Sequence, residues 1–221
     1  MPIPTPSLLL PPGPITRALH VLPTGQLTLT KKETPAIPPL LISALKVRAE
    51  VFIIEQQCSA AQEIDADDAV SWHWVIHGLD QSGQEAPAAT IRLIPAQAHA
   101  DADDEKAVEG PNYGGSRMWD GKEPYVKIGR LATVKEFRGR GYGRVLVEAA
   151  LGFAGGNPRG MVKDGGLGEW RGLVLAHAQK RLQKWYASMG WERDEGMDVW
   201  WEDGIEHVGM WRRVGVVEGG E

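Results

Sequence analysis

A strand, a glycine- and arginine-rich turn and a helix follow one another in the middle of the chain, and this succession constrains the fold more than any other feature. The segment PYVKIGRLATV, residues 124–134, has the composition of a buried strand. It leads into FRGRGYGR, residues 137–144, with three glycines and three arginines in eight positions. The apolar segment that follows predicts a helix over Gly143–Phe153. A strand joined to a helix by a short turn is the repeating unit of a mixed α/β fold.

Strands and helices are expected on both sides of this unit. The predicted strands lie near Leu27–Lys31, over residues 71–78, 87–96 and 173–178, and in a terminal hairpin over 197–213 that turns at Asp203-Gly204. The predicted helices cover residues 38–57, where prolines suit a helix start, and 179–190, which Gly190 closes as C-cap. In the two-residue hairpin, His207 is expected opposite Trp200.

The chain of 221 residues fits one domain, which we assign to residues 21–215. A proline-rich N-terminal arm over residues 1–20 precedes it, of which residues 1–14 are expected to be irregular or mobile. Residues 96–123 and 155–169, rich in small and polar residues, are predicted to be surface insertions.

Composition narrows the classes of partner. The formal net charge of −5 argues against nucleic acid, whose binders carry a basic excess. No apolar run approaches the roughly 20 residues of a membrane span, and the N-terminus does not resemble a signal peptide. With Cys58 as its single cysteine, the protein is expected in the cytoplasm, or alternatively the nucleus. His73 and His77, roughly 13 Å apart along a strand, do not form a metal site, and none is expected.

The glycine-rich turn is compatible with few ligands. A P-loop needs a Gly-Lys-Ser/Thr end, and the dinucleotide fingerprint needs G-x-G-x-x-G, whereas this turn has G-x-G-x-G. RNA-binding arginine–glycine tracts are usually repetitive, and this copy is single. Backbone N–H groups and arginines at a helix N-terminus suit a pyrophosphate. A turn that only packs the helix on the strand is the other interpretation.

The pattern R-x-x-G-x-G, formed by Arg138, Gly141 and Gly143, resembles the acetyl-CoA loop of the GNAT superfamily of N-acetyltransferases. Residues 47–68 and 201–212 resemble the first-helix signature and terminal hairpin of its ElaA-like subgroup, and residues 178–191 resemble the superfamily's second cofactor motif. The chain departs from the subgroup in its two longer insertions and in Ser59-Ala60-Ala61, where a proline and a tyrosine are usual. These departures bear mainly on the acceptor pocket.

The resemblance implies a GNAT fold of the α/β class, with a mixed central sheet of about six to seven strands flanked by helices. It also implies an N-acetyltransferase that moves an acetyl group from acetyl-CoA to a primary amine, by direct transfer in a ternary complex. The acceptor would be a small-molecule amine or a protein amine, and the protein a monomer or homodimer. A non-catalytic module that senses coenzyme A with the same fold is the alternative.

Site residues follow from the resemblance. Its implied cofactor-binding residues are Leu131, Ala132 and Thr133 of the strand, Arg138, Gly139, Arg140, Gly141, Tyr142, Gly143 and Arg144 of the loop, and Gln179. Tyr186 is the expected catalytic acid, because a phenol can protonate the departing thiolate. Gln179 has an equally good interpretation as a surface amide near a helix start, and Tyr186 could instead pack the helix on the sheet.

An alkylammonium must lose a proton before it attacks, and the leading candidates for the base are Glu63 and His207. Each has a structural alternative: Glu63 belongs to an acidic stretch that could be a solvated loop, and His207 could be a buried structural histidine. Cys58 could carry an acyl group in a two-step transfer, but a lone cysteine at a helix end is more often buried and inert.

Overall fold

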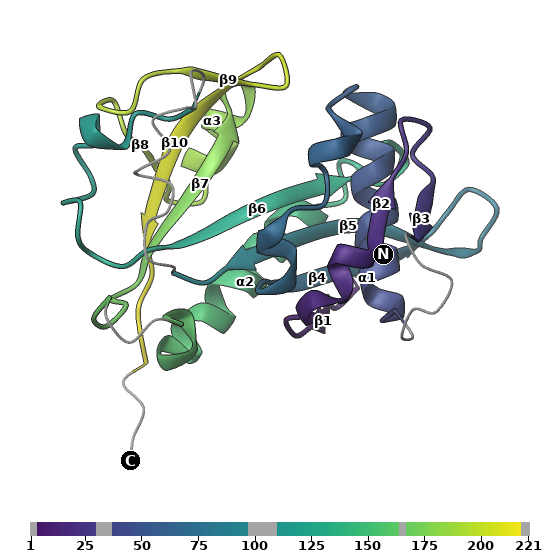
Figure 1. Cartoon of the computed structure of the whole chain (residues 1–221), viewed down its shortest axis with the longest axis horizontal. Helices are drawn as coiled ribbons and strands as arrows, with labels where there is room; N and C mark the ends of the chain where they lie inside the picture. The colour runs from purple at the N-terminus through teal and green to yellow at the C-terminus, as the bar shows by residue number, and fades with distance from the viewer. Residues whose placement is uncertain (1–3, 30–36, 97–109, 164–166, 218–221) are drawn as a thin grey trace. The chain divides into compact units, whose positions relative to one another are not determined.

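The computed structural model describes residues 4–29, 37–96, 110–163 and 167–217 (Figure 1). These residues form two compact units, one made of Met1–Ile94 and Gly129–Ala150, the other of Pro95–Ile128 and Leu151–Glu221. The single domain over residues 21–215 stays a prediction. Within the described ranges, no helix combines the length and the apolar character that a membrane span requires.

Most of the strands belong to one mixed sheet. Seven of them follow one hydrogen-bonded order: β1 (Ser7–Leu9), β4 (Trp72–Leu79), β5 (Glu85–Ile94), β6 (Val126–Thr133), β7 (Leu173–Gln179), β10 (Ile205–Arg213) and β8 (Glu192–Arg193). A further strand, β9 (Trp200–Glu202), pairs with β10. The register of β6 (Val126–Thr133) with β7 (Leu173–Gln179) is parallel over Val126–Ile128, whereas β4, β9 and β10 make antiparallel pairs. The α/β class and the mixed sheet expected from the sequence are confirmed.

In the first unit, helix α1 covers part of the sheet. α1 (Pro39–Arg48) begins with proline in its first turn and packs on β4 (Trp72–Leu79) and β5 (Glu85–Ile94). It continues directly as a π-helix, η2 (Ala49–Glu55). The chain then turns at Gln57, which has a φ of +59°. The helix predicted over residues 38–57 is therefore present at that position, but its first part is an α-helix and its second part a π-helix.

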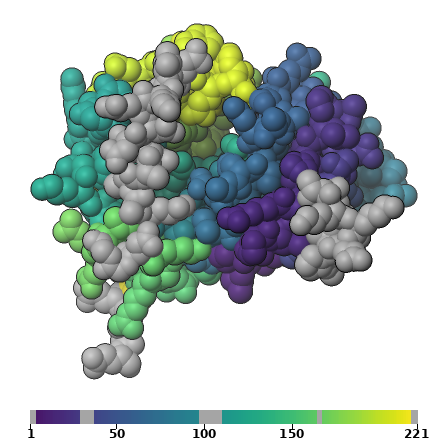
Figure 2. Space-filling model, in the orientation of Figure 1, coloured from purple at the N-terminus to yellow at the C-terminus, as the bar shows by residue number. Residues whose placement is uncertain are grey.

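The N-terminal segment is more regular than the expected arm. β1 (Ser7–Leu9) pairs antiparallel with β4 at the start of the strand order. β2 (Leu19–Val21) and β3 (Leu27–Leu29) form a separate two-stranded sheet. Leu19 packs with Leu41 and Leu45 of α1, so this segment contributes to the core of the first unit. Figure 2 shows the segment in purple beside the blue residues of that unit.

The second unit holds the C-terminal strands and a short helix. Its elements after β7 are η8 (Lys180–Leu182), α3 (Gln183–Ala187), β8 (Glu192–Arg193), β9 (Trp200–Glu202) and β10 (Ile205–Arg213). The hairpin turns at Asp203 and Gly204, whose φ angles are +49° and +73°, and His207 lies opposite Trp200 as predicted. The predicted helix over residues 179–190 is shorter than expected, because its first turn is 3₁₀.

The described parts of both expected insertions pack on the second unit. Tyr113, Met118 and Trp119 cover the apolar cluster around Trp200 and Trp211. Met161, in η7 (Pro158–Met161), is fully buried, and Ala96 bridges Val162. These parts are therefore more than surface loops. The rest of the insertions, residues 97–109 and 164–166, lies outside the described residues.

Candidate functional site

The glycine-rich loop joins β6 to helix α2 (Tyr142–Gly156) through the 3₁₀ turn η6 (Lys135–Phe137). Phe137 and Tyr142 are buried and stack with ring centroids 6.4 Å apart. Gly78 of β4 accommodates this ring pair, since a Cβ there would lie 2.9 Å from the Phe137 ring. The stacked rings thus fix the two ends of the loop, and residues 138–141 connect them.

Two loop glycines have backbone angles that other residues rarely adopt. Gly139 has a φ of +77° and Gly141 a φ of +82°. A Cβ at Gly139 would meet nothing within 4 Å. The loop ends at the N-terminus of a 15-residue helix, where the first N–H groups have no intrahelical acceptor and the helix dipole is positive. These residues fit a diphosphate, which needs close backbone approach and positive charge.

The arginines of the loop already contact the protein. Arg138 forms a bidentate ion pair with Glu55, and its Nε donates a hydrogen bond to the carbonyl oxygen of Thr133 at 3.0 Å. The Arg140 guanidinium lies 4.9 Å from the centre of the Phe137 ring and donates to the carbonyl oxygen of Glu136. Arg138 and Arg140 therefore brace the loop and are at the same time two of its three cationic groups.

Leu131, Ala132 and Thr133 form the end of β6, after the part that is in register with β7. Ala132 is buried with Val47 of α1 and Val51 of η2, whereas Leu131 and Thr133 are half-buried. Arg130, just before them, has a φ of +49°, which interrupts the regular strand. The strand end predicted to bind the pantetheine arm thus belongs to the same unit as the loop.

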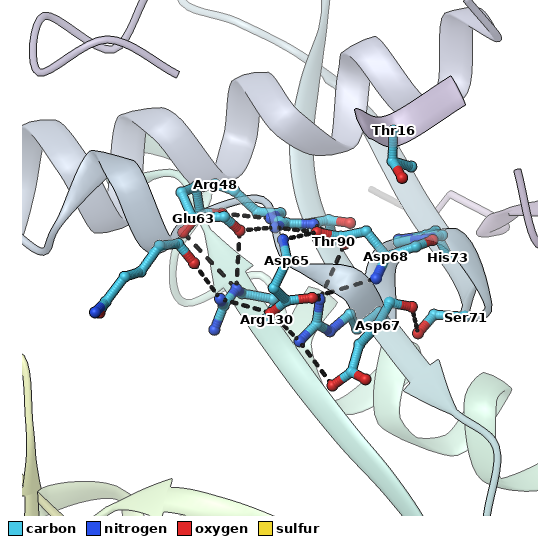
Figure 3. A network of polar contacts seen from close by, with 12 residues as sticks. Thr16, Arg48, Glu63, Asp65, Asp67, Asp68, Ser71, His73, Thr90 and Arg130 are labelled. Atoms are coloured by element: carbon cyan, nitrogen blue, oxygen red, sulfur yellow. Dashed lines mark hydrogen bonds and ion pairs between the residues drawn. The ribbon is translucent and has the colours of Figure 1, made fainter. Parts of the chain in front are cut away.

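Glu63 lies in a buried network of charges and is not part of a solvated loop (Figure 3). Its carboxylate accepts from Arg48 of α1, which also donates to Asp68 at 2.6 Å. Arg92 of β5 pairs with Asp65 at 2.6 and 2.8 Å, and Arg130 of β6 donates to Asp65 at 3.1 Å. Three arginines from three elements therefore pair with the acidic stretch.

The network and its burial shift the pKa values of Asp68 and His73. Burial alone would raise the pKa of Asp68, but the charges of Arg48 and Arg92 hold that pKa well below its usual range. Burial is also the main reason that the pKa of His73 is lowered to about 4. His73 Nε2 lies 3.1 Å from the carbonyl oxygen of Asp68, an acceptor, so this nitrogen carries the proton. Glu63, with Arg48 against it, is engaged as an ion-pair partner.

Tyr186, Gln179 and His207 lie in the second unit. Tyr186 is buried in α3 between Trp185 and Trp191, with ring centroids at 4.9 and 5.5 Å. Burial raises the pKa of its hydroxyl, which therefore stays protonated at neutral pH. Gln179 precedes η8, and its amide oxygen accepts from Arg181 at 3.0 Å.

His207 of β10 is buried beside Trp200 and Glu202. Its Nδ1 donates to the carbonyl oxygen of Ile205 at 2.9 Å, which leaves Nε2 as the acceptor nitrogen of the neutral ring. Nε2 lies 3.9 Å from Glu202 Oε2. His207 thus has an acceptor nitrogen, as a base needs, near a carboxylate.

Several polar residues that lie in these networks were not identified as candidates from the sequence. Arg48, Arg92 and Arg130 are isolated in the sequence, and only the helix and two strands bring them to the acidic stretch. His177 of β7 and Tyr113 of an expected insertion lie 2.9 Å apart, although 64 positions separate them. Because side chains alternate between the two faces of a strand, the sequence could have placed His177 on the same face of β7 as Leu173 and Leu175. It could not have shown that Tyr113 is the hydrogen-bond partner of His177. Among the described residues, no group of three or more potential metal ligands was found.

Known proteins that are similar to this chain include members of one enzyme family. The model of the acetyltransferase (GNAT) family matches residues 55–163. A UPF0039 protein of Mycobacterium tuberculosis is 30% identical over 174 residues, which is 78% of this chain and 83% of that protein.

Two crystal structures are similar in fold. An acyl-CoA N-acyltransferase from Pseudomonas aeruginosa is 30% identical, with a TM-score of 0.51 over 78% of this chain and 89% of that one. Escherichia coli ElaA is 25% identical, with a TM-score of 0.51 over 80% and 93% of the two chains. The expected resemblance to the ElaA-like subgroup is confirmed. By its relatives and its fold, the chain belongs to the acetyltransferase (GNAT) family.

Proposed function

We propose that the protein is an acetyl-CoA-dependent N-acetyltransferase that acetylates a primary amine, small or protein-borne, by direct transfer in a ternary complex. The observation that carries the proposal is the loop over residues 138–144, with two glycines at positive φ directly before a 15-residue helix. Membership of the acetyltransferase (GNAT) family supports the same activity, and the Pseudomonas relative is described as an acyl-CoA N-acyltransferase.

In this proposal the loop holds the diphosphate of coenzyme A. The backbone N–H groups of Gly139 to Arg144 and the first turn of α2 face it, and the guanidinium groups add charge. The backbone of Leu131, Ala132 and Thr133 pairs with the amide groups of the pantetheine arm, as an added strand would. Gln179 is a further cofactor contact. When bound, acetyl-CoA supplies an acyl group activated as a thioester.

The catalytic roles rest on protonation states. The Tyr186 hydroxyl carries its proton at neutral pH, and burial raises its pKa further, so it can donate a hydrogen bond to the sulfur as charge develops there. Of the two candidate bases, His207 has an acceptor nitrogen beside a carboxylate, whereas Glu63 is engaged with Arg48. His207 is therefore the better base of the two. Cys58 is not needed for direct transfer.

The test is release of free thiol from acetyl-CoA in the presence of a panel of primary amines, with calorimetric measurement of coenzyme A binding. Binding and amine-dependent thiol release are expected together. Binding without thiol release for any amine would favour the non-catalytic coenzyme A sensor. Absence of binding would contradict the cofactor site itself.

A further inference from the structure

Strand β6 is interrupted by a residue whose backbone angle is rare for its type. Arg130 has a φ of +49°, in the left-handed region that residues with a Cβ seldom occupy. Gln57 and Asp203 share this region but lie outside the strands, so among the described residues Arg130 is the one such non-glycine residue inside a strand. Arg130 is therefore held in a conformation that its own backbone disfavours.

The Arg130 side chain connects this point of the strand to the acidic stretch, residues 62–68 (Figure 3). Its Nη2 donates to the carbonyl oxygen of Gln62 at 2.9 Å and to Asp65 Oδ2 at 3.1 Å. Its Nε donates to the carbonyl oxygen of Glu63 at 3.4 Å. Two of these three acceptors are backbone carbonyl groups, so the guanidinium matches the path of the stretch as well as its charge.

The acidic stretch is itself fixed to the helix and strand that lie beside it. Arg48 of α1 donates to Asp68 at 2.6 Å, and Arg92 of β5 donates to Asp65 at 2.6 and 2.8 Å. Asp65 and Asp68 also accept hydrogen bonds from each other's backbone N–H groups, at 3.0 and 3.2 Å. The Arg130 guanidinium is therefore attached to a part of the chain that α1 and β5 already hold in place.

Residues 131–133, which follow the interruption, are held at their other end by a second arginine. Arg138 donates to the carbonyl oxygen of Thr133 at 3.0 Å, and its guanidinium pairs with the last residue of η2. Ala132 is buried between these two ends. The strand end that we assign to the pantetheine arm is thus fixed from both sides by arginine side chains, and all of these contacts lie within the first unit.

The backbone angle at residue 130 determines how the strand end is oriented. A residue with a Cβ disfavours the left-handed region by roughly tenfold in its local equilibrium. The hydrogen bonds of the Arg130 guanidinium offset this preference, because they form only while the side chain reaches the acidic stretch. An extended φ at this position would rotate the following peptide groups about the N–Cα bond, so that the N–H and C=O groups of residues 131–133 would point elsewhere.

We propose that Arg130 is a positioning residue for the cofactor, which holds the interruption in β6 and so orients the backbone of residues 131–133 toward the pantetheine arm. The inference rests on the proposed acetyltransferase function and adds a residue that acts without touching the cofactor. It also gives a reason for an arginine at a position with positive φ, since glycine would permit this conformation but would not fix it.

Calorimetry of coenzyme A binding in a graded series of variants tests this role. Arg130→Ala removes the side-chain contacts and keeps the preference against positive φ, so the affinity should fall by about tenfold. Arg130→Gly removes the same contacts but has no such preference, so the affinity should stay within about threefold of the wild type. Arg130→Asn tolerates the left-handed region better than alanine does and should lie between them. If the alanine variant does not fold, the order of the glycine and asparagine variants makes the same test.

The matched control has the same backbone angle in the other unit. Asp203 also has a φ of +49° and lies in the turn between β9 and β10. Asp203→Ala and Asp203→Gly should differ from each other in thermal stability and leave the coenzyme A affinity unchanged. Backbone NMR chemical shifts of residues 129–132 add a readout without ligand. The alanine variant should lose the positive φ at position 130, and the glycine variant should keep it.

Two results would overturn the positioning role and leave the proposed function intact, provided that the wild type binds coenzyme A and releases thiol with an amine. One is unchanged affinity in Arg130→Ala. The other is an equal loss of affinity in Arg130→Ala and Arg130→Gly, and retained affinity in Arg130→Lys would then assign Arg130 to attraction of the cofactor by charge. A wild type that binds no coenzyme A would instead contradict the cofactor site, and the positioning role with it.

Discussion

Arg138 and Glu55 form a bidentate ion pair, with Nη1 and Nη2 of the guanidinium 2.9 and 2.6 Å from the two carboxylate oxygens. The pair connects the glycine-rich loop to the end of the π-helical segment η2. Both side chains are partly exposed, 43% for Arg138 and 35% for Glu55. Such a pair contributes only about 0–1 kcal/mol to stability, so a diphosphate can compete with Glu55 for the guanidinium.

The first prediction follows from this competition. Arg138→Ala should weaken coenzyme A binding by about 1.5–3 kcal/mol, because a charge-assisted hydrogen bond is lost. Glu55→Gln should change affinity in the opposite direction by no more than about 1 kcal/mol. Isothermal calorimetry measures both. Arg171→Ala, a well-exposed arginine of the second unit, is the control. Equal affinity in the wild type and Arg138→Ala would remove this arginine from the cofactor site.

The second prediction separates backbone strain from loss of binding. Gly141 and Gly83 both have a φ of +82°, so a valine at either position should cost about 1–2 kcal/mol of stability. Gly83 lies in the turn between β4 and β5, away in sequence from the loop. Only Gly141→Val should also weaken coenzyme A binding. Thermal melting and calorimetry on both variants make the comparison, and parallel loss of binding in both would point to strain alone.

The third prediction concerns Tyr186. Since burial raises the pKa of its hydroxyl, the phenol should act as a hydrogen-bond donor throughout pH 6–9. Tyr186→Phe should lower turnover by about 10²-fold, the low end for general acids, because a thiolate is a fair leaving group. Coenzyme A affinity should be nearly unchanged, since the ring remains packed between Trp185 and Trp191. Wild-type turnover in the phenylalanine variant would make Tyr186 a packing residue.

The fourth prediction concerns stability in acid. The pKa of His73 is lowered to about 4 in the folded protein, against about 6.5 unfolded, so its contribution is fully present above pH 6.5 and is lost as the pH falls toward 4. The loss should reach about 2 kcal/mol between pH 7 and 4.5. Asp68, whose pKa is also lowered, extends the loss to more acidic pH.

Urea unfolding at pH 7 and 4.5 measures this loss. His73→Gln keeps a donor for the carbonyl oxygen of Asp68 but does not titrate, so its stability should fall less over the same interval. A pH dependence equal to that of the wild type would assign the acid sensitivity to other groups.

Local patterns were sufficient for much of the fold. The strand β4, the glycine loop before α2 and the Asp203-Gly204 turn all depend on neighbours within a few positions, and the structure has each of them where the sequence placed it. The opposition of His207 and Trp200 also follows, because a two-residue turn fixes the register of both strands. The prediction of an irregular N-terminal arm was wrong for Ser7–Leu9, which form a strand. A strand of three residues is too short to show a periodic pattern in the sequence.

The sequence by itself determined the class of fold, the loop and its resemblance to a family, since these depend on short spacings and backbone preferences. Only the tertiary structure decided which charges meet. Arg48, Arg92 and Arg130 join the acidic stretch, and Tyr113 joins His177 and Glu202, across many positions of the chain. Buried charges must find partners, because leaving one unpaired in a low-dielectric interior costs several kcal/mol. Composition shows that such groups exist, but only packing determines their partners.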